Sequence, residues 1–250
     1  DRILVSLDFD ADGSSFIESL VMLASKLNAE LCGLFTEDSD LQQIANLPFS
    51  REITFPTAHT RELNSEQIAR HLKQHAETLR KMMQDLSQLS NVACSFRTIK
   101  GPRIESVLSE SYDFQIVAFL PEKYSSLTPR QHARLDELIN PTVMFYDGSK
   151  QAQKSADIVK ALAEKGDLQE LIILALNNGC DAQAKELFSS DEVKVSCQKT
   201  DSYSISDIIS LVETQKAGLV ILPLEDELIK QSSELRKMLD VLKCPLLLVR

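Results

Sequence analysis

Three aspartates at alternate positions are the first residues of this chain whose types and spacing could do chemistry. Asp8, Asp10 and Asp12 match the first three ligand positions of a calcium loop, D-x-D-x-D-G. The last ligand of such a loop is a Glu, but Ser19 stands at that position here. The sequence therefore favours a turn that caps the following helix. A metal-dependent enzyme that uses the three carboxylates is the minor alternative.

Two histidines, His71 and His75, are spaced so that they share one face of a helix and could chelate a metal. No third ligand is apparent, and the Glu of the H-E-x-x-H motif is missing. We therefore interpret them as part of a solvated helix flank, with no metal bound. The chain also lacks the G-x-S-x-G motif of hydrolases, so the motifs favour a protein that is not an enzyme.

The stretch 36–63 carries another polar group, formed by Arg51, His59 and Arg61. It is far longer than the connections of about five residues that are usual in compact domains. Loops of this length are often lids or interaction surfaces, but a packed Ω-loop without a ligand fits equally well. We predict that the three side chains lie over a ligand crevice beside Asp8, where they would meet an anion.

Composition and charge exclude several classes of function. The chain has 27 Lys and Arg against 37 Asp and Glu, a net charge of −10, and no basic stripe. Nucleic acid and anionic membranes are therefore not expected partners. No apolar run approaches the ~20 residues that cross a bilayer. The five cysteines are an odd number without a C-x-x-C pair, which predicts free thiols in a reducing cytoplasm.

The elements that position these residues alternate along the chain between short apolar strands and amphipathic helices. Segments such as LIILAL and LVILPL are apolar throughout, as parallel strands covered by helices on both faces are. The alternation predicts an α/β fold with doubly wound parallel sheets. The expected strands are 3–8, 30–36, 92–99, 114–120, 142–147, 169–176, 193–199, 217–223 and 245–250. The expected helices are 14–27, 65–89, 102–111, 127–139, 149–165, 180–188, 203–216 and 227–242.

An internal repeat divides the chain into two copies of one strand–helix unit. LDELINP at 135–141 reappears as LDVLKCP at 239–245, and an apolar strand follows each. Such self-similarity indicates a duplicated architecture. We expect a first domain over 1–140, which contains the long insertion, and a second, trimmed domain over 141–250.

These patterns resemble a tandem universal stress protein, from the adenine-nucleotide α-hydrolase-like superfamily. The opening ILVSLDFD is similar to that family's first strand, and GPRI at 101–104 is similar to the turn after its third strand. The closing LKCPLLLVR is similar to its final strand. The second copy has the family's Asp-Gly-Ser. The resemblance implies strand order 3-2-1-4-5 in each copy, with a crevice between strands one and four. The candidate crevice residues are Asp8, Asp10, Asp147, Gly148, Ser149, Arg51, His59 and Arg61.

One departure from the family pattern bears on the ligand. Nucleotide-binding members carry G-x-x-G and then G-[S/T] after the fourth strand, so that backbone N–H groups approach the phosphates. The corresponding segments 121–141 and 223–245 contain no glycine. We therefore predict that ATP does not bind in the family's manner to either copy, and we expect no cofactor. An adenine-shaped pocket beside Asp8 or Asp147 that takes ATP or AMP is the alternative.

The function that follows is that of a non-enzymatic regulatory or stress-response module in the cytoplasm. Its expected partner is another protein, a second copy of the chain or a small ligand. The alternative is an adenine-nucleotide-binding universal stress protein with weak or no hydrolysis.

A count of the strands adds a structural prediction. Two full copies need ten strands, but nine are readable, and 142–147 has the marks of both the fifth strand of copy one and the first strand of copy two. A strand has only two edges for hydrogen bonding, so it cannot be both. We assign it to the second copy. The apolar strand 114–120 is then an edge that strand 245–250 or a neighbouring subunit must cover.

Overall fold

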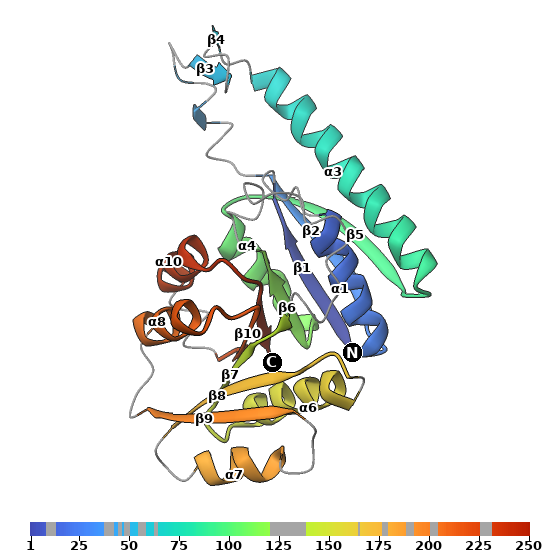
Figure 1. Ribbon diagram of the computed structural model, residues 1–250. Helices are drawn as coiled ribbons and strands as arrows, with labels where there is room; N and C mark the ends of the chain where they lie inside the picture. Colours follow the sequence, from blue (N-terminus) through green and yellow to red (C-terminus); the bar gives the residue numbers. More distant parts are fainter. Residues whose placement is uncertain are drawn as a thin grey trace.

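The computed structural model of the chain is built around one large sheet (Figure 1). Its strands are β1 (Arg2–Leu7), β2 (Glu30–Glu37), β5 (Cys94–Lys100), β6 (Ile116–Phe119), β7 (Thr142–Tyr146), β8 (Glu170–Leu176), β9 (Lys194–Thr200), β10 (Leu219–Pro223) and β11 (Leu246–Val249). They are arranged in the order β5-β2-β1-β6-β11-β10-β7-β8-β9. The residues that the structure describes are 1–8, 14–37, 43, 44, 47, 51–54, 59–62, 65–120, 139–164, 166–176, 180–188, 193–200, 205–225 and 232–250.

Helices cover both faces of this sheet, so the predicted α/β class is confirmed. The helices are α1 (Ser14–Lys26), α3 (Ser65–Leu89), α4 (Arg103–Glu110), α6 (Lys150–Glu164), α7 (Cys180–Leu187), α8 (Ile205–Gln215) and α10 (Ser232–Val241). One face packs against α1, α3, α6 and α7, and the other against α4, α8 and α10. The expected helix 127–139 lies outside the described residues except for its last residue. No helix in the described ranges is long and apolar enough to cross a membrane.

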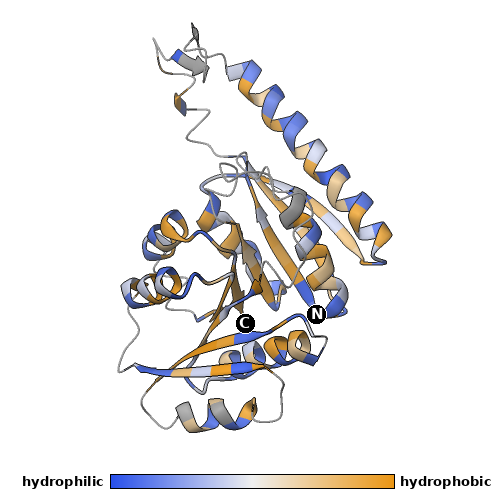
Figure 2. Cartoon of the chain, viewed as in Figure 1, coloured by the Kyte–Doolittle hydropathy of each residue, from blue (hydrophilic) through white to orange (hydrophobic). Residues whose placement is uncertain are grey.

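The apolar strands are buried as their composition predicts. Figure 2 shows hydrophobic residues concentrated in the sheet and on the helix surfaces that face it. Every residue of β6, β7, β10 and β11 is buried. The outer strands β5 and β9 instead alternate between exposed and half-buried residues. The doubly wound pattern therefore places the most apolar strands in the middle of the sheet, where both faces exclude water.

The strand order resolves the double marking of 142–147. In the first half of the chain, β5-β2-β1-β6 are parallel and follow the order 3-2-1-4. In the second half, β9-β8-β7-β10-β11 follow 3-2-1-4-5. Strand β7 pairs with β8 and β10, so its assignment as a first strand is confirmed. The domain boundary between residues 140 and 141 stays a prediction.

The two halves meet at an antiparallel seam between β6 and β11. Ala118 is opposite Leu247, and Val117 is opposite Leu248. The apolar edge of β6 is therefore covered by the last strand of the same chain, which is one of the two predicted possibilities. Because this edge is already paired, it provides no argument for a dimer.

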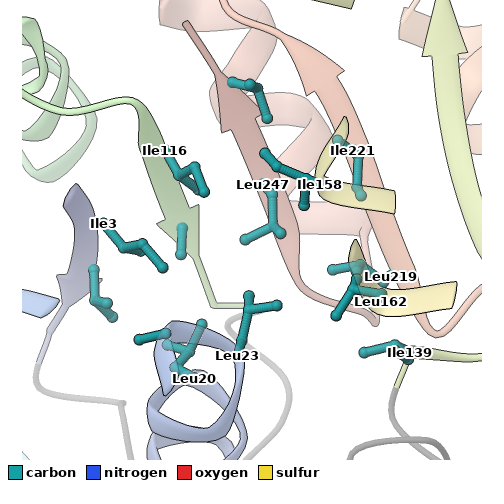
Figure 3. Close-up of a cluster of buried hydrophobic side chains, with 14 of the residues drawn as sticks. Ile3, Leu20, Leu23, Ile116, Ile139, Ile158, Leu162, Leu219, Ile221 and Leu247 are labelled. Carbon is teal, nitrogen blue, oxygen red and sulfur yellow. The ribbon is translucent and has the colours of Figure 1, made fainter. Parts of the chain in front are cut away.

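The hydrophobic core passes under this seam without a break. Leu20 and Leu23 of α1 lie below the first half, and Ile158 of α6 lies below the second (Figure 3). Ile116 and Leu247 from the two seam strands join the same buried cluster. A core shared in this way predicts that the two halves unfold together, since neither can lose its packing without exposing the other.

Polar contacts also tie the halves together. Lys26 of α1 forms an ion pair with Asp167, which follows α6. On the other face, the Glu105 carboxylate of α4 accepts a hydrogen bond from the Ser232 hydroxyl of α10 at 3.0 Å. Gln115 accepts two hydrogen bonds from the ends of the sequence. Its main-chain oxygen accepts the Arg250 N–H at 2.9 Å, and its side-chain oxygen accepts the Arg2 N–H at 2.8 Å.

The insertion 36–63 contains two short strands that the sequence did not predict. β3 (Arg51–Thr54) and β4 (His59–Glu62) form an antiparallel hairpin in which Arg51 is opposite Glu62 and Glu52 is opposite Arg61. The hairpin lies beyond the start of α3, apart from the large sheet (Figure 1).

We expect Leu247→Ala to reduce the free energy of unfolding by about 2–5 kcal/mol, because it leaves a cavity in the core beneath the seam. Leu247 is 0% exposed, whereas Leu89 is 85% exposed, so Leu89→Ala serves as the matched control. The control should change stability by about 0.5 kcal/mol or less. Urea unfolding followed by circular dichroism gives both values. Two separate transitions in the wild-type protein would contradict the shared core.

Candidate functional site

The antiparallel seam places the two predicted crevices at opposite edges of the sheet. In each half the crevice lies at the carboxyl ends of the first and fourth strands, where open α/β sheets bind ligands. Those strands are β1 and β6 in the first half, and β7 and β10 in the second. Since β6 and β11 run in opposite directions, Asp8 after β1 and Asp147 after β7 lie at opposite edges. The structure therefore does not bring these two aspartates together.

At the predicted first crevice the structure places an arginine that the sequence did not assign to it. The guanidinium of Arg103 forms an ion pair with the carboxylate of Asp8. Its Nε donates to the Ser6 hydroxyl at 3.0 Å, and its Nη2 donates to the main-chain oxygen of Leu120 at 3.4 Å. Ser6 belongs to β1 and Leu120 follows β6, so Arg103 bridges the two strands that define the crevice.

Local sequence explains how Arg103 reaches this position. Gly101 has φ +143°, which L side chains rarely adopt, and a Cβ there would lie 2.9 Å from the Ser106 hydroxyl. Pro102 has φ −66° and directly precedes α4, so Arg103 is the first helical residue. A cation at a helix N-terminus is unfavourable with respect to the helix dipole. The contact with Asp8 supplies the opposite charge that offsets this cost.

The second crevice has a different arrangement of polar groups. The Asp147 carboxylate accepts a hydrogen bond from the Ser149 N–H at 2.8 Å. The Ser149 hydroxyl accepts the Ala152 N–H at 3.0 Å and so caps α6. Gly148 has φ +81°, which the tight turn from β7 into α6 requires. Asp147, Gly148 and Ser149 therefore form one capped turn.

The remaining predicted crevice residues are only partly visible. Asp10 lies outside the described residues, as does Asp12. Arg51 is exposed at the start of the hairpin. The side chains of His59 and Arg61 are outside the described set, although their backbones form β4. Their predicted position over Asp8 stays a prediction.

The histidine pair lies on α3 as the spacing predicts. His71 is exposed, and His75 is half-buried with its ring 6.0 Å from that of Phe35. Within the described part of the chain, no three His, Cys, Asp or Glu side chains group closely enough to hold a metal ion.

The cysteines differ strongly in burial. Cys32 and Cys244 are buried, whereas Cys94 and Cys197 are half-buried, and all four are free thiols. Burial raises the pKa of the Cys94 thiol. Burial raises the pKa of Cys244 to about 12. Because the thiolate is the reactive form, these two thiols are poor nucleophiles at neutral pH.

Comparisons with known proteins bear on the fold alone. The chain is similar over 100% of its length to a solved universal stress protein from Archaeoglobus fulgidus DSM 4304, with a TM-score of 0.59 and 11% sequence identity. The match covers 96% of that protein's chain. This chain has a universal-stress-protein-like fold. A scan of protein-family models and a search of curated proteins each find no match.

The contact between Asp8 and Arg103 is testable by a double-mutant cycle. Their side chains are 21% and 12% exposed, so water screens the pair weakly. We expect a coupling energy of about 1–3 kcal/mol from Asp8→Asn and Arg103→Met in urea unfolding. Glu77 and Arg80 form an exposed pair on α3 and are the matched control. Their cycle should give about 0.2–1 kcal/mol, and equal coupling in both cycles would contradict the assignment.

Cys244 makes a second prediction, for alkaline pH. Its folded pKa of about 12 lies above the ordinary value of 9.0, so the unfolded chain loses the proton first as the pH rises. The stability that the neutral Cys244 thiol contributes is thus fully present below pH 9. Above pH 9 the folding equilibrium constant falls by about tenfold for each further pH unit, until the folded thiol ionises. We would measure the free energy of unfolding of the wild type and of Cys244→Ala by urea unfolding over this pH range. The difference between the two proteins isolates the effect of Cys244 from the titration of lysine and tyrosine side chains. Parallel pH profiles of the two proteins would refute the expectation.

Proposed function

We propose that this chain is a cytoplasmic, non-enzymatic module of the universal-stress-protein type that binds a partner protein or a small ligand for a regulatory or stress-response role. The proposal also states that neither half holds ATP in the manner of nucleotide-binding members. The observation that carries it is the position of Arg103, whose guanidinium contacts Asp8, Ser6 and Leu120 at the ends of β1 and β6.

The chemistry of the first crevice supports this proposal. A bound adenosine group would compete with the Arg103 guanidinium for Asp8 and for the Leu120 carbonyl. Displacing a guanidinium from a half-shielded carboxylate costs binding free energy, which lowers the affinity for any ligand that must do so. The sequence adds an independent argument, since the segments 121–141 and 223–245 lack the glycines that a phosphate cradle uses.

Adenine-nucleotide binding in the second half is the competing function. The capped turn of Asp147, Gly148 and Ser149 favours it, because this turn keeps the family's residues at the end of a central strand. The same hydrogen bonds also have a purely structural reading. Asp147 and Ser149 satisfy backbone N–H groups at the start of α6, which any helix of this kind requires.

Isothermal titration with ATP and with AMP at millimolar concentration tests the proposal. We expect no saturable heat for either nucleotide with the wild-type protein. Thermal unfolding should agree, because a ligand at about 100 times its Kd adds roughly 2.7 kcal/mol of stability. Asp147→Asn and Asp8→Asn are the matched variants. Saturable binding of ATP that Asp147→Asn abolishes and Asp8→Asn leaves intact would replace the proposal by the competing function.

A further inference from the structure

Three described groups contact Arg103 at the first crevice, and each is a hydrogen-bond acceptor. The Asp8 carboxylate, the Ser6 hydroxyl oxygen and the Leu120 main-chain oxygen come from two neighbouring strands and converge on one point. One of them carries a negative charge and two are neutral. Such a set recognises a cation with several N–H donors and repels an anion.

The geometry matches a guanidinium in particular. The three acceptors contact three different nitrogens of Arg103, namely Nη1, Nε and Nη2. A planar guanidinium presents its donors in a fixed fork, whereas an ammonium is a compact point charge. Acceptors that are spread around the fork therefore favour the guanidinium over an ammonium of equal charge.

Burial indicates that these acceptors form a built site. Ser6 is 0% exposed, and the Arg103 side chain is 12% exposed. The arginine reaches the site from α4, an element that lies outside the two strands supplying the acceptors. The acceptor set and its occupant therefore come from separate segments, as a receptor and its ligand do.

We propose that the first crevice is a guanidinium-binding site and that Arg103 of the same chain is its resident ligand. A guanidinium compound is then the class of ligand that the site takes when Arg103 is absent or displaced. This inference rests on the proposed function only in that it names the ligand class of one of its crevices.

Chemical rescue of Arg103→Ala with methylguanidinium tests the inference. We expect Arg103→Ala to melt roughly 3–10 °C below the wild type, because the variant loses the contacts of the guanidinium. Methylguanidinium at about 10 mM should recover several degrees of this loss by binding the vacated acceptors, and should leave the wild type unchanged. Methylammonium at the same concentration is the matched probe, since it has the charge but lacks the fork.

Arg80→Ala is the matched control variant, because it removes an arginine from an exposed ion pair on α3. Its melting temperature should respond to neither probe. The inference is overturned if methylguanidinium stabilises Arg103→Ala no more than it stabilises Arg80→Ala. Equal rescue by methylammonium would also overturn it, since the site would then recognise charge alone.

Arg103→Lys keeps the test decisive if Arg103→Ala does not fold. Lysine retains the positive charge next to Asp8 but cannot donate to three separate acceptors from a planar group. We expect Arg103→Lys to melt several degrees below the wild type, and equal stability of the two would refute the inference. No nucleotide enters these experiments, so their outcome is distinguishable from a failure of the proposed function in the ATP titration.

Discussion

The antiparallel pairing of β6 with β11 is the constraint on which the rest of this structure depends. The first half has four parallel strands and would leave the apolar edge of β6 open to water or to other chains. The fifth strand of the second half closes that edge and joins two parallel sheets into one. The cores beneath the two sheets then become continuous on both faces. A missing strand in one half and a shared core are thus two aspects of the same interaction.

The seam also separates the two predicted crevices in space. Because β6 and β11 run in opposite directions, the carboxyl ends of the parallel strands in the two halves lie at opposite ends of the sheet. At one edge a cation from the helix side neutralises Asp8, whereas at the other Asp147 organises the start of a helix. The described contacts of the two aspartates thus differ: Asp8 contacts an arginine, and Asp147 accepts a hydrogen bond at the start of α6.

Much of this architecture could be predicted from the sequence because its signals are local. Continuous apolar runs marked the buried strands. The repeat around residues 135–141 and 239–245 led to a strand count that predicted a covered edge at 114–120 and left strand 245–250 or a neighbouring subunit as its cover. Arg103 was not assigned to the crevice, because its contacts with Ser6 and Leu120 join segments far apart in the chain. The only local signal was the Gly-Pro turn before it. The hairpin of β3 and β4 was missed because its strands are short and rich in charge, unlike the buried strands.

Hydrogen bonds of Gln115 hold residues 2 and 250 beside each other. Arg2 is bound through the side chain and the main-chain N–H of Gln115, and Arg250 is bound through the main-chain oxygen of Gln115. The two ends of the sequence therefore lie close enough to be joined without changing the order of the strands in the sheet. A circular permutant that links residue 250 to residue 2 and opens the chain between β3 and β4 would preserve every strand pair of the large sheet. Its new termini would emerge from the β3-β4 hairpin, which is not paired with any strand of the large sheet.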